Sequence, residues 1–550
     1  MKIAKYKHQL MIILIGALFF IPYLGDVHLF DWDEINFAEA AREMIITGNY
    51  LNVMIDFEPF HEKPPLFIWL QVISMKIFGI NEFAARFPNA LIGIITLLVL
   101  YYIGKNIYDR IFGLFWVLVY LGSLLPHFYF KTAIIDPLFN LLMYLSIYFI
   151  FNFYSNNDVK NIIYAAVFSS LAVLTKGPVG IMLPLISWIT YFIILKKNEK
   201  YPIKEIFIYL AIGLIPSIIW YLIVFFNSGN AVFTDFIYYQ IRLLTTGEAG
   251  HEGPLYYHFI VLFLGCLPGS VFILRAFRKN QLDNSQQNNF KIFNIIILCV
   301  VLIVFSIVKT KIVHYSSLAY FPITYLVAYV VYLISTGKLV WKLSSTILLS
   351  IFGLILSLAL FWFPIIMYNI DIFLPKIEDS FTREVLKANG GWTGYEWING
   401  AVYFIALIIT VVLLTLGKYV RAFMVLFSST AIIIFLLLPV LAPRIEAYTQ
   451  NAPISFYKSL SGQDVYIQPI GFKTYAHYFY SNRKPSNSKI SLNMTNQEFE
   501  NYLLYGNINK QAYFVAKLEK GLELIKNNSE LRLINIKNGF VFLTRHANGT

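Results

Sequence analysis

Charged residues are scarce in this chain. They make up 13% of its 550 residues, whereas soluble domains usually carry about 25%. Hydrophobic residues account for 58% of the chain, and the mean hydropathy is +0.63. Such a composition excludes an ordinary water-soluble protein, because too few polar residues remain to cover its surface. The chain is therefore expected to lie mostly in a lipid bilayer.

Cysteine is also rare, and the sequence shows no internal repeat. Cys266 and Cys299 both lie inside apolar runs, which favours inert membrane-helix residues over a disulfide framework or a zinc knuckle. Neither a Walker-type phosphate cradle nor a dinucleotide fingerprint is evident. The net charge of +12 comes from Lys and Arg in short stretches between apolar runs, which indicates membrane topology and no nucleic-acid partner.

About thirteen apolar runs are long enough to cross the hydrocarbon core, which takes roughly 17 to 25 residues. The first follows a basic start, but it is long and no small-residue cleavage site comes after it, so we expect a retained helix rather than a signal peptide. The runs lie near 9–27, 86–104, 111–128, 137–153, 161–177, 178–195, 206–226, 257–275, 292–308, 316–335, 343–367, 401–417 and 422–441.

The connecting segments predict the orientation. Short loops rich in Lys and Arg, such as 105–110, 196–204 and 338–342, belong on the cytoplasmic side. The N-terminus is then cytoplasmic, and an odd number of spans places the last segment outside. We therefore expect a transmembrane domain at 1–441 and a soluble periplasmic α/β domain at 442–550.

The outward segments are longer than the inner loops and richer in acidic residues, His, Trp and Gly. Within 28–85, INFAEAAREMIITG and PLFIWLQVISMKIFG have the spacing of amphipathic helices that lie along a membrane surface. Such helices would roof a cavity at the outer interface. In the C-terminal segment, QDVYIQPI and GFVFLTR favour strands, whereas NQEFENYLLYG and KGLELIKNN favour helices.

Carboxylates at two outward positions are candidates for chemistry. Asp33 and Glu34 belong to Asp31-Trp32-Asp33-Glu34, directly after the first span, and Asp136 lies at the mouth of the fourth. A carboxylate beside lipid is costly unless it is paired, solvated or functional. Two that converge could serve as a base and as an orienting partner for a nucleophile, although capping of the following helices explains each equally well.

Several cations face the same side of the membrane. Lys63 belongs to His61-Glu62-Lys63-Pro64-Pro65, and a Lys beside the interface offers a point charge to a phosphate. Alternatively, each cation is an interfacial anchor whose stem lies along lipid. The other outward-facing groups are Lys176, Arg242, His251, Lys309, Lys311, His314 and Tyr315.

These residue types suit cleavage of a sugar-phosphate bond. That reaction needs positive charge to stabilise the departing phosphate and a base to deprotonate the incoming nucleophile. Because a nucleotide cradle is missing, a lipid-phosphate donor suits the sequence better than a soluble nucleotide sugar.

At these positions the chain resembles the bacterial relatives of protein O-mannosyltransferases, and especially the lipid A aminoarabinose transferases, which have the GT-C membrane glycosyltransferase fold. The resemblance covers most of residues 20–330, and the span count and outer C-terminal domain agree with the aminoarabinose branch. It rests on the ordered motifs WDEINFAEAAREM, FHEKPPLFIWL, KTAIIDP, TKGPVG, GHEGPLYYH and VKTKIVHYSSLAYFP.

The resemblance implies roles for individual residues. Asp33, of the Asp-Glu pair that includes Glu34, would be the base or the acceptor-orienting residue, with Asp136 as the second carboxylate. Lys63 would contact the carrier phosphate, helped by Arg242, Lys311 and Lys176. Where aminoarabinose transferases usually show a Leu-Pro pair, this chain has Ile312-Val313-His314-Tyr315-Ser316, so the acceptor or sugar pocket is expected to differ.

A divalent metal is a further candidate cofactor. Glu62 and His251 match a Glu and a His of the aminoarabinose members, and such ligands suit zinc. Two protein ligands nevertheless make an incomplete site, and the mannosyltransferase relatives are thought to work without metal.

Three functions remain open at this point. The first is transfer of one sugar from a polyprenyl (undecaprenyl) phosphate donor to lipid A or another envelope lipid, on the periplasmic face of the bacterial inner membrane. The second is protein O-glycosylation. The third is a transporter or flippase for a lipid-linked sugar, which the lack of a repeat and of midplane polar groups disfavours.

Overall fold

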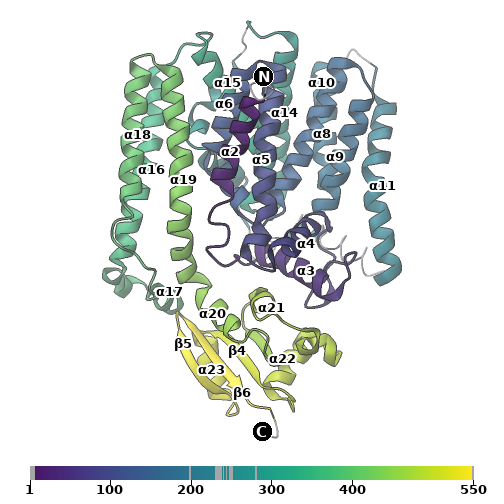
Figure 1. The fold of residues 1–550 in the computed structure, drawn as a ribbon, viewed down its shortest axis with the longest axis vertical. Coiled ribbons are helices and arrows are strands. Elements are labelled where there is room, and N and C mark those ends of the chain that lie inside the picture. The colour runs from purple at the N-terminus through teal and green to yellow at the C-terminus, as the bar shows by residue number, and fades with distance from the viewer. Residues whose placement is uncertain are drawn as a thin grey trace.

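A bundle of helices and a smaller domain at one of its ends make up the protein (Figure 1). The computed structural model describes residues 6–196, 200–228, 252–278 and 281–547, together with residues 234, 238, 241, 242, 245 and 246. The N-terminal end of the chain lies at the far end of the bundle, and the C-terminus lies at the tip of the small domain.

Each of the thirteen apolar runs coincides with a helix or a bent pair of helices. Within the described residues, eight helices are long and apolar enough to cross a membrane, or up to ten spans if each of two bent pairs counts as one. The eight are α5 (Glu82–Ile107), α8 (Asp136–Asn156), α11 (Ile203–Ser228), α14 (Ser285–Ile307), α15 (Tyr320–Ser335) with the preceding η4 (Val313–Ala319), α16 (Leu343–Tyr368), α18 (Ile398–Thr415) and α19 (Tyr419–Thr449).

The other runs are shorter or bent, which explains why a count by length gives fewer spans. Both bent pairs turn sharply, by 82° and 110°. They join α6 (Arg110–Leu121) to α7 (Leu124–Phe128) and η1 (Tyr129–Lys131), and α13 (Tyr257–Gly265) to η3 (Gly269–Phe277). The three remaining runs are α2 (Lys7–Phe20), α9 (Lys160–Lys176) and α10 (Val179–Leu195).

The basic loops meet at the bundle end that lies away from the small domain. Gln287, at the start of α14, donates a hydrogen bond to the Ile107 carbonyl at the end of α5, at 3.2 Å. The Tyr332 hydroxyl of α15 donates to Asp109 at 2.7 Å. These contacts join loops that the charge pattern assigns to one side of the membrane.

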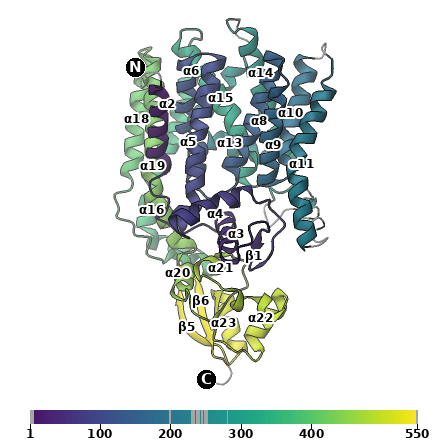
Figure 2. The ribbon, with the colours of Figure 1, turned by 45° about the vertical axis from the view of Figure 1, so that its right-hand side comes forward.

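Two helices cross the other end of the bundle, between the spans and the small domain (Figure 2). They are α3 (Asp33–Thr47) and α4 (Leu66–Phe78), as the sequence predicts. A short hairpin, β1 (Met54–Ile55) with β2 (Glu58–Pro59), lies between them. Residues 34–44 of α3 are all buried, because this helix is enclosed on every side instead of facing lipid.

The small domain is an α/β module with its own apolar core. Its sheet has the order β3-β4-β6-β5, in which β3 and β4 run parallel and the other pairs antiparallel. All four elements expected from the sequence are present. They are β3 (Tyr466–Ile470), β6 (Phe540–Arg545), α22 (Asn496–Tyr505) and α23 (Leu518–Asn527), joined by β4 (Ala512–Lys517) and β5 (Arg532–Lys537).

The last span does not end at the bundle. Helix α19 continues to Thr449, past residue 441 where the sequence pattern divides the chain, and α20 (Asn451–Ser459) follows at once. This helical connection places the small domain in contact with α3 and with the segment that joins α2 to α3.

Candidate active site

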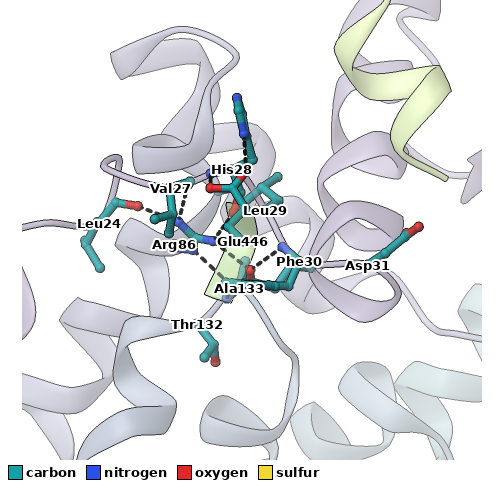
Figure 3. Close-up of polar contacts among 12 residues, drawn as sticks. Leu24, Val27, His28, Leu29, Phe30, Asp31, Arg86, Thr132, Ala133 and Glu446 are labelled. Carbon is teal, nitrogen blue, oxygen red and sulfur yellow. Dashed lines mark hydrogen bonds and ion pairs between the residues drawn. The ribbon is translucent and has the colours of Figure 1, made fainter. Parts of the chain in front are cut away.

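A buried arginine organises the segment between α2 and α3. Arg86 of α5 donates to the carbonyls of Leu24, Val27 and His28 at 2.8–2.9 Å. It also forms a two-point ion pair with Glu34, at 2.7 and 3.0 Å. Figure 3 shows these carbonyls converging on Arg86, with Asp31 pointing away from them. The turn that precedes α3 is therefore fixed before any substrate binds.

Glu34 is fully engaged in this arrangement. Its carboxylate also accepts hydrogen bonds from the Ala133 N–H at 2.6 Å and the Phe30 N–H at 2.8 Å, and the residue is 5% exposed. Both carboxylate oxygens are therefore occupied by protein donors, two from Arg86 and two from backbone N–H groups. Glu34, expected from the sequence as a catalytic candidate, holds the loop before α8 in contact with α3 and α5.

Asp33 and Asp136 meet on either side of a histidine. His314 Nε2 lies 3.6 Å from Asp33 Oδ2 and 3.9 Å from Asp136 Oδ2, and Asp136 Oδ1 accepts a 2.6 Å ion pair from Lys176. The Asp33 side chain is 35% exposed, whereas that of Asp136 is 3% exposed. Neither aspartate caps its helix through its side chain, so the capping explanation does not account for them.

Side-chain amides fix the elements that carry these groups. Asn89 of α5 donates to the Thr132 and Ile134 carbonyls, both at 2.7 Å, in the loop that leads to Asp136. Asn140 of α8 donates to the Ser317 hydroxyl at 2.7 Å, and Ser317 in turn donates to the His314 carbonyl. Contacts among α5, α8 and η4 thus hold in place the cluster of Asp33, Asp136 and His314, which we call the Asp33 cluster.

A cavity of about 870 Å³ opens beside Asp33. Asp33, Glu62, Lys63 and His314 line it. Its apolar walls come from α7, from Ile312 and Val313, and from α19 at Leu438, Pro439, Leu441, Ala442 and Ile445. A chamber with a few polar groups and long apolar walls suits an amphiphilic ligand with a polar headgroup.

Glu62, Lys63 and Arg242, which the sequence also predicts for the site, lie in or next to the cavity. Glu62 and Lys63 line the cavity, and Arg242 lies 4.0 Å from the Glu62 carboxylate. Lys63 and His314 both line this cavity, which relates the two residues to each other. Asp33, Glu62 and Lys63 thus share one chamber, whereas Asp136 and Arg242 adjoin it through His314 and Glu62.

Two other predicted positions give a different result. Lys311 donates to the Phe305, Ser306 and Val308 carbonyls at 2.5–2.8 Å, so it caps the C-terminal end of α14 and does not line the cavity. His251 lies outside the described residues. The described residues contain no group of three or more His, Cys, Asp and Glu side chains placed to hold a metal ion, and the zinc site stays a prediction.

Several polar residues of the cavity are not evident from the sequence, among them Arg86, Lys473 and Tyr475. Arg86 interrupts the start of an apolar run, and a charge at that place is itself a signal of function or of burial with a partner. Lys473 and Tyr475 line the cavity from the small domain. They carry no local motif, because their position depends on how that domain docks.

Parts of the chain are similar in sequence to known proteins. Residues 62–224 match the family described as dolichyl-phosphate-mannose-protein mannosyltransferase. Over 336 residues the chain is 28% identical to an undecaprenyl phosphate-alpha-4-amino-4-deoxy-L-arabinose arabinosyl transferase of Wigglesworthia glossinidia brevipalpis, which covers 60% of this chain and 59% of the relative. A similarly named transferase of Proteus mirabilis is 27% identical over 46% of this chain and 48% of its own. The chain thus spans less than two thirds of the length of these relatives.

The fold matches over nearly the whole chain. The crystal structure of ArnT from Cupriavidus metallidurans bound to undecaprenyl phosphate superposes with a TM-score of 0.77, at 16% identity, over 99% of both chains. The apo form of the same protein gives the same score. The GT-C fold expected from the sequence is confirmed, including the small C-terminal domain, and the chain is a multi-pass membrane protein.

Proposed function

We propose that this chain, an ArnT-like member of the GT-C glycosyltransferase superfamily, transfers one sugar from a polyprenyl-phosphate donor to an envelope lipid such as lipid A. Transfer takes place on the periplasmic face of a bacterial inner membrane, with the N-terminus in the cytoplasm. The observation that carries the proposal is the shared chamber in which a carboxylate, Asp33, and a cation, Lys63, lie beside long apolar walls.

Asp33 and Lys63 have different roles in this proposal. Asp33 is the more exposed of the two aspartates, so it orients the acceptor nucleophile and takes its proton as the nucleophile bonds to the sugar. Lys63 binds the donor phosphate and stabilises the charge that it gains when its bond to the sugar breaks. Both substrates therefore meet between Asp33 and Lys63.

Residues behind the chamber position these two. His314 lies between Asp33 and Asp136, and Lys176 neutralises Asp136, so this chain of contacts orients the Asp33 carboxylate. Arg242 is placed behind Glu62 and adds positive potential near the donor phosphate. Lys176 and Asp136 are positioning residues in this proposal, and Lys311 caps the end of α14.

A reconstitution experiment tests the proposal. Purified protein in lipid nanodiscs receives a polyprenyl-phosphate-linked radiolabelled sugar and lipid A, and labelled lipid A is measured. We expect transfer by the wild-type protein, loss of at least about 100-fold in Lys63→Ala, and no change in Lys537→Ala, an exposed lysine of β5. Transfer at the wild-type rate by both Lys63→Ala and Asp33→Asn would remove the assignment of roles.

Protein O-glycosylation is the second candidate. The match of residues 62–224 to the protein mannosyltransferase family favours it, whereas the relatives similar over a longer part of the chain carry the arabinosyl transferase name. Mass spectrometry of lipid A and of envelope proteins from a deletion strain separates the two. Unchanged lipid A together with lost glycopeptides would select the protein acceptor.

A further inference from the structure

The small domain enters the cavity at one place, the segment 471–475 that follows β3. Lys473 and Tyr475 of this segment line the chamber together with Asp33. The segment is tied to the turn before α3, because the Asp31 carboxylate accepts a hydrogen bond from the Tyr475 N–H at 3.2 Å. The Asp31 N–H in turn donates to Gln450 at 3.2 Å. The rim of the cavity is therefore built jointly by both domains.

Two aromatic rings contact the Lys473 ammonium. It lies 4.8 Å from the centroid of the Trp32 ring and 5.5 Å from that of Tyr475, and the two rings contact each other edge to face at 5.6 Å. Within the described residues, Lys473 forms no ion pair and no hydrogen bond. Ring contact orients an ammonium group and leaves N–H donors that can bind an oxygen ligand.

Other cations of the chamber are already engaged. Arg86 is occupied by Glu34 and three backbone carbonyls, and Lys131 donates to the Pro22 carbonyl at 2.6 Å. Lys63 belongs to the donor side in the proposed function. Lys473 is therefore a second positive centre in the chamber, supplied by a different domain.

The geometry points to Lys473 as the residue that binds a phosphate group of the lipid acceptor. This inference rests on the proposed function, because two substrates must share the chamber and only one phosphate belongs to the donor. The α19 wall at Leu438, Leu441 and Ile445 provides apolar surface for a lipid, which favours an amphiphilic phosphorylated acceptor over a soluble one. Docking of the small domain thereby completes the acceptor site.

Equilibrium binding in nanodiscs tests this role without requiring turnover. The probes are diphosphoryl lipid A, the same lipid A after enzymatic dephosphorylation, and polyprenyl phosphate. We expect wild-type protein to bind the phosphorylated lipid A about tenfold more tightly than the dephosphorylated form, as one charge-assisted contact allows. Lys473→Gln should abolish that preference, Lys473→Arg should keep it, and Lys537→Gln should behave as wild type.

Three results would overturn the inference. They are a wild-type protein without phosphate preference, a Lys473→Gln variant that retains the preference, and a variant that loses polyprenyl phosphate binding instead. A general loosening of the small domain would weaken binding of both lipid A forms equally, and this too counts against the role. Failure of the proposed function looks different, because then no sugar leaves the polyprenyl-phosphate donor even though all three lipids bind as expected.

Discussion

Two acidic residues of helix α3, Asp33 and Glu39, lie in opposite environments. In its first turn, Asp33 lines the cavity, and His314 Nε2 lies 3.6 Å from its carboxylate. Two turns later, Glu39 forms a two-point ion pair with Arg42 at 2.5 and 2.7 Å, and both side chains are almost fully buried. A carboxylate that is 35% exposed and lines a cavity can bind a substrate, whereas a saturated buried ion pair is part of the scaffold.

The buried Glu39–Arg42 pair links α3 to the small domain. Arg42 also donates to the Asn482 side chain and the Arg483 carbonyl, both at 3.1 Å, and Arg483 pairs with Asp56 at 3.2 Å. These contacts hold segment 481–483 against α3. The same domain supplies Lys473 to the cavity. The scaffold cluster, which consists of Glu39, Arg42 and Glu43, therefore helps to hold the domain that carries Lys473 in place.

The first prediction has the largest expected effect and tests whether Asp33 serves catalysis or stability. Asp33→Asn should lower sugar transfer by about 10³-fold, within the range for loss of a general base, with an unchanged thermal unfolding midpoint. The control is Asp26→Asn, which alters another carboxylate of the same cavity and should keep most activity. A loss of activity in Asp33→Asn that is matched by a lower unfolding midpoint would make Asp33 a scaffold residue after all.

The second prediction addresses the buried pair. Arg42→Ala should lower the free energy of unfolding by about 3–5 kcal/mol, because it leaves the Glu39 carboxylate buried without its partner. Denaturation in detergent micelles measures the change, and Arg532→Ala on the exposed face of β5 is the matched control. If Arg42→Ala unfolds like the control, the cluster does not hold the two domains together.

Much of this contrast could not be predicted from the sequence. The thirteen apolar runs and both amphipathic helices follow from length and periodicity, which depend on local residue order. Asp33 and Glu34 are neighbours with the same chemistry and both line the cavity, yet the Asp33 side chain is 35% exposed whereas Glu34 is buried and bound by Arg86. Only the packing of α5 against the α2–α3 connection decides between them.

The cations show the same limit. Lys311 and Lys473 both belong to short polar segments near the membrane surface, but Lys311 caps α14 whereas Lys473 reaches the cavity. A charge pattern predicts the side of the membrane on which a Lys lies. It does not predict whether a helix end or a substrate accepts the hydrogen bonds of that Lys. The answer depends on contacts between segments about 440 residues apart, such as the one between Asp31 and Tyr475.

The third prediction concerns Asp31, which joins the two domains at the cavity rim. Burial raises its pKa from 3.8 to about 6. Since the folded state binds the proton more tightly, Asp31 favours folding fully below pH 3.8, and this contribution is lost as the pH rises through 6. Asp31→Asn should therefore be more stable than wild type at pH 8, by up to about 3 kcal/mol.

Thermal unfolding between pH 4 and pH 8 measures this difference. The gain in Asp31→Asn should shrink as the pH falls from 6 towards 4, because the wild-type carboxyl then becomes neutral as well. Asp464→Asn is the control, since Asp464 lies at the surface of the small domain, where Lys510 and hydrogen bonds lower its pKa. A pH-independent difference for Asp31→Asn would show that the substitution acts through packing instead of ionisation.

The smallest expected effect tests whether the scaffold cluster holds one negative charge or two. Burial and the neighbouring Glu39 raise the pKa of Glu43 to about 10, so Glu43 is a neutral acid at pH 7 that accepts a hydrogen bond from the Phe57 N–H at 2.9 Å. Glu43→Gln keeps the size, the neutrality and the acceptor, and should change the unfolding free energy by less than about 0.5 kcal/mol. Glu39→Gln, in contrast, removes the charge that Arg42 requires and should cost several kcal/mol. Equal destabilisation by both substitutions would mean that Glu43 is ionised, and that Arg42 is shared by two carboxylates.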